Sequence, residues 1–281
     1  MKRIAYTLSL CLMATISAYA QDLKLPALSP NAKISQEVST STIEISYGRP
    51  SMRGRKIFGG DVVPYGAIWR TGANSATKIK IGEEVEVAGG ILKAGEYALY
   101  TIPNADTWEI IINKGVGNWG AAGYSTEDDV ARFKVKPTTM ANEVTTFTIN
   151  IADITSTSCN LELMWEKTKV VIPIKFNNKE RLATSIDKAL NNPTLPYYQV
   201  ASYYYENGQN TEQAYDYVNK ATEANPKAFY MWHLKAKIAQ KLGKKADAQA
   251  AAEKSIETAK GTAFEADYIR NNQKIIDWAK K

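Results

Sequence analysis

The spacing of apolar residues changes once along this chain, near residue 178, and that change limits the folds that the sequence can adopt. Between residues 32 and 178 apolar and polar residues alternate, as in segments 43–47 and 170–176. Alternation with a period of two is typical of half-buried β-strands. Roughly ten such runs, separated by clusters of Gly, Pro, Asn and Asp, predict an antiparallel β-sandwich or a barrel-like sheet. The clearest unit is a hairpin of segments 96–102 and 108–113.

Beyond residue 178 the pattern becomes helical and repeats after 34 residues. Four pairs of residues with similar side chains show this spacing: Tyr198 and Trp232, Ser202 and Ala236, Ala214 and Ala248, and Ala221 and Ser255. Small residues at such positions let paired helices approach closely. The pattern resembles the tetratricopeptide repeat, so we expect helical hairpins here. Residues 180–190 and 262–279 are expected to form a preceding and a terminal helix.

The first twenty residues have the features of a secretory signal. Lys2 and Arg3 precede a mostly apolar stretch over 4–16, and Ala18 and Ala20 place small residues before a cleavage site at Gln21. The stretch is shorter than the roughly 20 residues that span a bilayer, and we expect no transmembrane segment. We therefore expect a secreted protein, with the periplasm favoured over the extracellular space.

These observations divide the chain into four expected parts. They are a signal peptide (1–20), an N-terminal extension (21–31), a β-sandwich domain (32–178) and a tetratricopeptide-like α-helical domain (179–281). The fold class is thus an all-β domain followed by an all-α segment.

The net charge of +6 does not indicate a nucleic-acid partner once it is divided among these parts. Residues 21–178 hold 17 basic and 17 acidic residues, and residues 179–281 hold 16 and 12. The small excess is spread over helix surfaces, whereas nucleic-acid sites concentrate basic residues on one face. We expect no nucleic-acid partner.

Histidine and cysteine are scarce, which excludes several kinds of chemistry. His233 is the only histidine, and Cys159 is the only cysteine outside the expected signal. A multi-histidine metal site is impossible, and the β half has no histidine to activate a serine or cysteine nucleophile. We expect no metal and no cofactor. Cys159 lies in a strand-like segment and is expected to be a buried structural thiol, and His233 a structural or surface residue.

Two short segments hold candidate ligand-binding residues. Arg49, Arg53 and Arg55 lie in a stretch without a carboxylate, and guanidinium groups suit carboxylate or phosphate ligands. The alternative is a turn in which these arginines cap strand ends or pair with acids elsewhere. Further along, Trp69 and Arg70 could form a cation–π shelf for a sugar or a carboxylate, with Asn74 beside it. Here the alternative is a buried Arg70 and Asn74 that brace loop carbonyls, with Trp69 in the core. Asn113 and Trp119 complete the set of candidates.

Several motifs in the β half are recognisable together. They span residues 47–59, 63–77, 93–103, 108–113 and 119–120. With them the chain resembles a secreted bacterial family catalogued as domain of unknown function 2911, over about residues 30–176. Members of that family often carry a signal peptide and a helical C-terminal segment. The resemblance implies no activity, substrate or cofactor.

The sequence leaves three functional hypotheses. The first is a non-catalytic binding or accessory protein, with a small polar or anionic ligand or a sugar on the β domain and a protein partner on the helical repeats. The second is a carboxylate-based hydrolase or lyase acting on a glycan-like substrate, which requires two carboxylates about 5–10 Å apart in a pocket. The third is a purely structural or assembly module. An aromatic-lined pocket with Arg70 and two such carboxylates favours the second hypothesis. A sandwich without a pocket, with Arg70 buried in backbone hydrogen bonds, favours the third.

Overall fold

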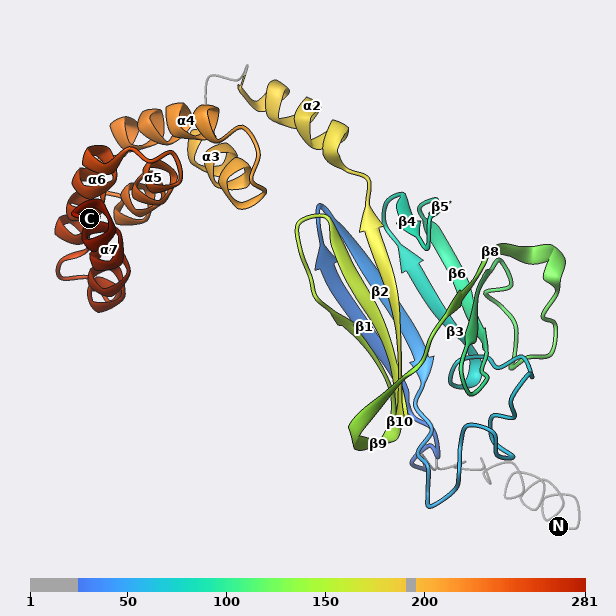
Figure 1. Cartoon of the computed structure of the whole chain (residues 1–281). Helices are drawn as coiled ribbons and strands as arrows, with labels where there is room; N and C mark the ends of the chain where they lie inside the picture. Colours follow the sequence, from blue (N-terminus) through green and yellow to red (C-terminus); the bar gives the residue numbers. More distant parts are fainter. Residues whose placement is uncertain (1–24, 191–195) are drawn as a thin grey trace, which may run out of the picture. The chain divides into compact units, whose positions relative to one another are not determined.

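A computed structural model of the chain describes residues 25–190 and 196–281 (Figure 1). These residues form two compact units. One contains the described residues up to Asp153 together with Cys159–Ile174, and the other contains Ile154–Ser158 and Lys175–Lys281. The expected signal peptide and its cleavage site lie outside the described residues.

The first unit contains two antiparallel sheets, as the alternating pattern predicts. The larger sheet has the strand order β1-β2-β3-β6-β7-β8 and the smaller one β5-β4-β10-β9. The larger sheet consists of β1 (Asn31–Val38), β2 (Ser41–Gly48), β3 (Ala73–Ile81), β6 (Gly95–Ile102), β7 (Trp108–Asn113) and β8 (Asp129–Val135). The smaller sheet consists of β4 (Val85–Val87), β5 (Gly90–Leu92), β9 (Thr138–Ala152) and β10 (Ser158–Phe176).

The alternation places apolar side chains on one face of each strand. In β2, Ile43, Ile45 and Tyr47 are buried, and the apolar residues of segment 170–176 in β10 are buried too. The predicted hairpin is the antiparallel pair β6–β7, in which Ile102 lies opposite Glu109. The strand positions and their buried faces therefore follow from the sequence pattern.

A cluster of aromatic rings contacts both sheets. Trp69 stacks on Trp165 of β10, with ring centroids 6.0 Å apart, and meets Phe147 of β9 at 5.1 Å. Phe58 contacts Trp108 of the larger sheet at 4.9 Å and Trp165 at 6.2 Å. Edge-on and offset contacts of this kind stabilise beyond the area that they bury. The long segment between β2 and β3, which carries Phe58 and Trp69, is thereby packed into the core.

Glu166 holds the same segment through its backbone. The Glu166 carboxylate accepts hydrogen bonds from the amides of Ile57 (2.7 Å) and Phe58 (3.2 Å). Glu166 sits at an irregularity in the β9–β10 pairing and has a positive φ of 51°. An irregularity of this kind redirects a side chain away from the regular pleat, and here the side chain reaches the segment between β2 and β3, which pairs with strands only through isolated bridges.

The second unit is helical. Its helices are α2 (Lys179–Leu190), α3 (Tyr197–Glu206), α4 (Thr211–Ala224), α5 (Phe229–Lys241), α6 (Lys245–Ala259) and α7 (Glu265–Ala279). α3 packs on α4, α5 on α6, and α6 on α7 (Figure 1). The small side chains of Ala214, Ala236 and Ala248 are fully buried. The helices thus lie where the 34-residue spacing predicts them, while their assignment to the tetratricopeptide class stays a prediction.

His233 joins a chain of buried polar groups in the helical unit. Its Nδ1 lies 2.8 Å from Asn272 Oδ1, while Asn272 Nδ2 donates to Ser255 Oγ (2.9 Å) and to Tyr268 O (2.8 Å). Because the Asn272 amide nitrogen is already used, its oxygen faces the imidazole, and Nδ1 carries the proton. His233 therefore has a structural role, as expected.

No helix among the described residues is long and apolar enough to cross a membrane.

The Cys159 thiol should be inert in the folded protein. It is free and buried, and burial raises its pKa to about 11. Since the thiolate is the reactive form, a chain prepared without residues 1–20, whose one cysteine is Cys159, should not react with Ellman's reagent at pH 8 and should release one equivalent when urea is added. Rapid stoichiometric reaction without urea would contradict the buried position.

Stability should depend on pH through His233. Burial lowers the His233 pKa; the bond to Asn272 opposes this and nearby Lys237 adds to it. The unfolded chain therefore binds this proton more readily. The contribution of neutral His233 to the free energy of unfolding is complete above the pKa of the residue in the unfolded chain, about 6.5. It decreases as the pH falls from that value through the lower pKa of His233 in the folded protein. Between pH 7.5 and 5 the free energy of unfolding, measured by urea unfolding followed at 222 nm, should fall less for His233→Gln than for the wild type. Equal losses would refute the prediction.

Candidate ligand-binding site

The three arginines of the basic segment reach three different parts of the β unit. Arg49 is half-buried and donates to Phe147 O (3.1 Å) and Thr148 Oγ1 (2.8 Å) on β9. Arg53 donates to Leu28 O (3.0 Å). Arg55 donates to two carbonyls of its own turn, those of Met52 and Ser51, both at 2.9 Å. These contacts are made to backbone carbonyls and one hydroxyl group, and they do not bring the guanidinium groups together.

Trp69 lies in the core and not on a surface shelf. It is 7% exposed, and its Nε1 donates to Gly72 O at 3.1 Å. The turn that follows is conformationally unusual, because Thr71 and Asn74 have positive φ values of 54° and 65°. A β-branched residue rarely adopts this region. The Thr71 hydroxyl donates to Thr101 Oγ1 (3.1 Å), and the Thr71 carbonyl accepts from the Thr77 hydroxyl (2.5 Å). Buried hydrogen bonds thus hold the strained turn.

Arg70 and Asn74 connect this turn to a neighbouring loop. Arg70 Nη1 donates to Asn74 O at 2.8 Å, and the same carbonyl accepts from the amide of Gly120 at 3.2 Å. A Cβ on Gly120 would lie 2.9 Å from Arg70 Nη1, so the guanidinium rests directly on that glycine. Asn74 Nδ2 donates to Ser29 O at 3.0 Å. These contacts agree with the alternative from the sequence in which Arg70 and Asn74 brace backbone carbonyls.

Asn113 anchors both ends of that loop, which spans residues 114–128 between β7 and β8. It is fully buried; its Nδ2 donates to Ser125 O and Asp129 Oδ1, both at 2.9 Å, and its Oδ1 accepts from the amide of Gly115 at 2.7 Å. With both amide groups occupied by the chain, Asn113 acts as a structural tie.

A charged cluster fixes the far side of the loop. Arg132 pairs with Glu109 (2.7 Å) and Asp129 (3.0 Å) and also contacts the Tyr124 hydroxyl. The Tyr124 ring packs on Tyr100 of β6 at 5.1 Å. Burial and then the bond to Asp129 raise the Tyr124 pKa, so this hydroxyl remains a donor at neutral pH. The loop is held against the larger sheet by contacts at both ends.

Trp119 is the candidate aromatic whose side chain is available to a ligand. It is 68% exposed, although its backbone is fixed, since Trp119 pairs with Ser75 in an isolated bridge and its neighbour Asn118 accepts from the amide of Ala76 at 3.2 Å. The loop therefore presents an exposed indole beside the start of β3.

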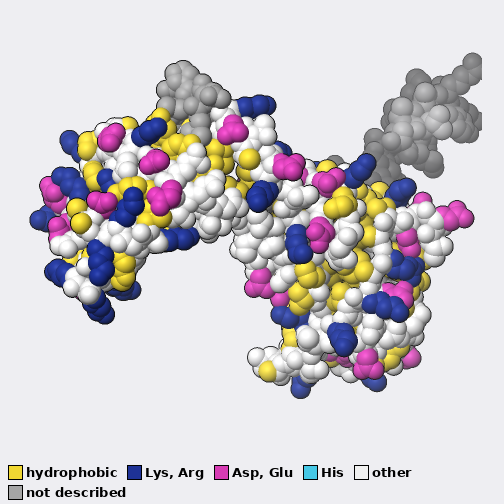
Figure 2. All heavy atoms as spheres, turned by 45° about the horizontal axis from the view of Figure 1, so that its top comes forward, with side chains coloured by type: hydrophobic (Ala, Val, Ile, Leu, Met, Phe, Trp, Pro, Cys, Tyr) yellow, Lys and Arg dark blue, Asp and Glu magenta, His cyan; other side chains and the backbone are white. Residues whose placement is uncertain are grey.

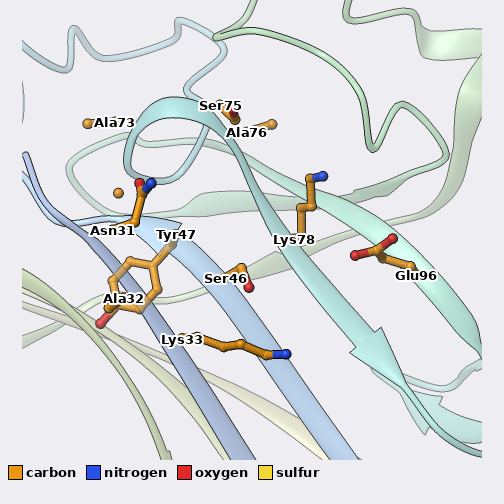
Figure 3. A pocket seen from close by; sticks show the side chains of 11 residues that line it. Asn31, Ala32, Lys33, Ser46, Tyr47, Ala73, Ser75, Ala76, Lys78 and Glu96 are labelled. Carbon is orange, nitrogen blue, oxygen red and sulfur yellow. The ribbon is translucent and has the colours of Figure 1, made fainter. Parts of the chain in front are cut away.

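A groove of about 420 Å³ adjoins this position on the outer face of the larger sheet (Figure 3). Its polar lining comes from β1, β2, β3 and β6 and consists of Asn31, Lys33, Ser46, Ser75, Lys78 and Glu96. Lys33 and Lys78 are both direct cross-strand partners of Ser46, so the three form a row across three strands. Ala73, which belongs to the Trp69–Asn74 turn, and Ala76, which follows it, also line the groove.

Opposite charges lie together along this face. Glu44 accepts from Lys33 at 2.7 Å and lies 3.5 Å from Lys80. The hydrogen bond between Lys33 and Glu44 raises the pKa of the lysine and lowers that of the glutamate. Figure 2 shows basic and acidic side chains interspersed over the visible face of both units. The groove thus offers donors and acceptors without a strong net field.

Of the groove residues, sequence reasoning missed Lys33, Ser46, Lys78 and Glu96. The alternation identifies all of them as residues of polar strand faces. Their proximity depends on the cross-strand register and on the pairing of β3 with β6, which the sequence does not reveal.

Among the described residues, no group of three or more His, Cys, Asp or Glu side chains is arranged to hold a metal ion.

The fold and the groove define a two-part protein: a unit of two antiparallel sheets, with a polar groove on the outer face of the larger one, and a helical unit that follows it. The chain belongs to the family described as protein of unknown function DUF2911, whose model matches residues 29–174, just over half of the 281-residue chain. This confirms the resemblance read from the motifs of the β half. No curated protein and no solved structure matches the chain.

Replacing Arg70 should loosen the loop that carries Trp119. Arg70→Ala removes the donor to Asn74 O, a hydrogen bond from a charged group whose loss costs about 1–3 kcal/mol. The urea midpoint should fall, and amide exchange at Gly120 should become faster. Arg55→Ala is the matched control, because Arg55 is exposed and bonds only its own turn; its effect should stay within about 0.5 kcal/mol. Equal effects of the two variants would contradict the bracing role.

Proposed function

We propose that this protein is a non-catalytic binding or accessory module whose β unit holds a small polar ligand in the outer-face groove. The groove itself is the observation that carries the proposal. Its volume of about 420 Å³ falls within the range of roughly 300–1,000 Å³ that is usual for small-molecule sites. The row formed by Lys33, Ser46 and Lys78 supplies polar groups that converge on this space.

This proposal moves the ligand site away from the arginine segment. Arg49 and Arg70 already donate to backbone or side-chain oxygens, and Trp69 is buried. A ligand at those positions would have to replace existing hydrogen bonds, which leaves buried acceptors unpaired at a cost of about 1–3 kcal/mol each. In contrast, the lysines of the groove face solvent, so ligand binding there breaks no buried bond.

Glu44 is not suited to be the protonated carboxyl group of a carboxylate-based hydrolase. A carboxylate-based hydrolase needs one carboxyl group that stays protonated near neutral pH, which requires a raised pKa. Glu44 lies on the groove face, and its pairing with Lys33 lowers its pKa. The glutamate is therefore ionised under working conditions and suits an acceptor role.

We further propose that the β unit is a sandwich and that the helical unit is a tetratricopeptide-like array that contacts a protein partner. The ring contacts of Trp69 and Phe58 with both sheets support the first assignment. The agreement between the 34-residue spacing and the helix pairs α3–α4 and α5–α6 supports the second. Export through the N-terminal signal, with the periplasm favoured, belongs to the same proposal.

The groove can be tested by thermal shift of the mature full chain against separate sets of sugars, carboxylates and phosphorylated compounds. A ligand present at 100 times its Kd stabilises the native state by about 2.7 kcal/mol and should raise Tm by several degrees. Lys78→Ala should reduce the shift. Lys134→Ala is the matched control, because Lys134 lies on the same sheet in β8 but outside the groove. If no compound raises Tm, or if Lys78→Ala retains the full shift, the groove is not the binding site and a structural module is favoured.

A further inference from the structure

The exposure of Trp119 contrasts with the firm attachment of the loop that bears it. The indole is 68% exposed, while the loop is fixed by Asn113, by the Arg132 cluster and by Arg70 under Gly120. A ligand that stacks on Trp119 therefore meets a platform whose backbone is already ordered, and little conformational entropy is lost on binding.

The bridge to Ser75 places this platform at the groove. Ser75 is a lining residue, and its strand partner in the bridge is Trp119. Directly bridged residues lie about 4.5–5.5 Å apart at Cα. Trp119 does not itself line the groove, but its backbone lies directly beside that of a residue that does, so a ligand longer than the groove can extend to the indole.

The polar groups of this surface do not suit a compact anion or cation. Sites for phosphate or sulfate bring several donors together on one point, whereas here Glu96 lines the same groove as Lys33 and Lys78. The Lys33 ammonium group also forms an ion pair with Glu44 at 2.7 Å, so its charge is already partly balanced. A free anion is repelled by the carboxylates, and a free cation by the lysines.

A sugar ring fits this combination. Its rim of hydroxyl groups both donates and accepts, which matches serine, asparagine, lysine and glutamate side chains, and its C–H face packs on an indole as other apolar surfaces do. We infer that the groove binds a saccharide, one ring of which stacks on Trp119 while its hydroxyls bond to Ser46, Lys78 and Glu96. This inference rests on the proposed function and names the ligand class.

The inference can be tested with an array of neutral and acidic oligosaccharides probed with the mature full chain, followed by calorimetric titration with the best-bound compound. Trp119→Ala should weaken binding about tenfold or more, as is common when a central aromatic anchor is removed. Trp119→Phe should retain part of the affinity, because phenylalanine keeps a flat apolar face. Tyr65→Ala is the control, since Tyr65 is another exposed aromatic of the β unit and lines a different pocket, whereas Trp119 is bridged to a groove residue. Trp119 makes few packing contacts, so the far-UV spectrum and urea midpoint should be unchanged.

The outcomes separate the two proposals. Saccharide binding that falls in Trp119→Ala and Lys78→Ala but not in Tyr65→Ala supports the inference. Saccharide binding that is unaffected by Trp119→Ala overturns it. If citrate or inorganic phosphate raises Tm in a manner that depends on Lys78 while no saccharide binds, the ligand class is wrong and the groove proposal survives. If neither class binds, both proposals fail.

Discussion

The packing of Trp69 against Trp165, with ring centroids 6.0 Å apart, is the contact on which the arrangement of the β unit depends. Trp69 lies in the long segment between β2 and β3, which has few strand partners of its own. Trp69 and Phe58 are buried against both sheets, and the Glu166 carboxylate accepts hydrogen bonds from the Ile57 and Phe58 amides. These contacts together hold the segment in place. Removing such an aromatic side chain typically costs about 3–5 kcal/mol, which is a large part of the stability of most domains.

Burial of Trp69 also determines where its neighbours lie. The turn after it adopts positive φ at Thr71 and Asn74, and Arg70 is directed toward Gly120. The same turn leads into Ala73 and Ala76, which line the groove, and its contacts hold the loop that carries Trp119. The Trp69–Asn74 turn is thus a structural support, and the candidate binding surface lies beside it. Strained backbone of this kind persists only where the surroundings enforce it.

Much of the fold was predictable from the sequence because burial follows periodicity. The inward positions of β2 and of the end of β10, the β6–β7 hairpin and the change to helices all follow from the spacing of apolar residues. The site was less predictable. Trp69 and Trp119 are the same residue type in loops, yet one is 7% exposed and the other 68%. The partners of the arginines depend on which carbonyls tertiary pairing brings near, and the Lys33–Ser46–Lys78 row depends on cross-strand register. Neither is encoded in local spacing.

The helical unit is joined to the β unit through β10, and this strand is internal to its sheet, with β4 on one side and β9 on the other. Where tension on the helices pulls that strand along its axis, it acts on the hydrogen bonds at both edges of the strand. Hydrogen bonds in an antiparallel sheet run nearly perpendicular to the strand axis, so a pull of this kind shears several bonds together instead of opening them one at a time. The strand that leads into the helices is therefore secured to the smaller sheet by two neighbours.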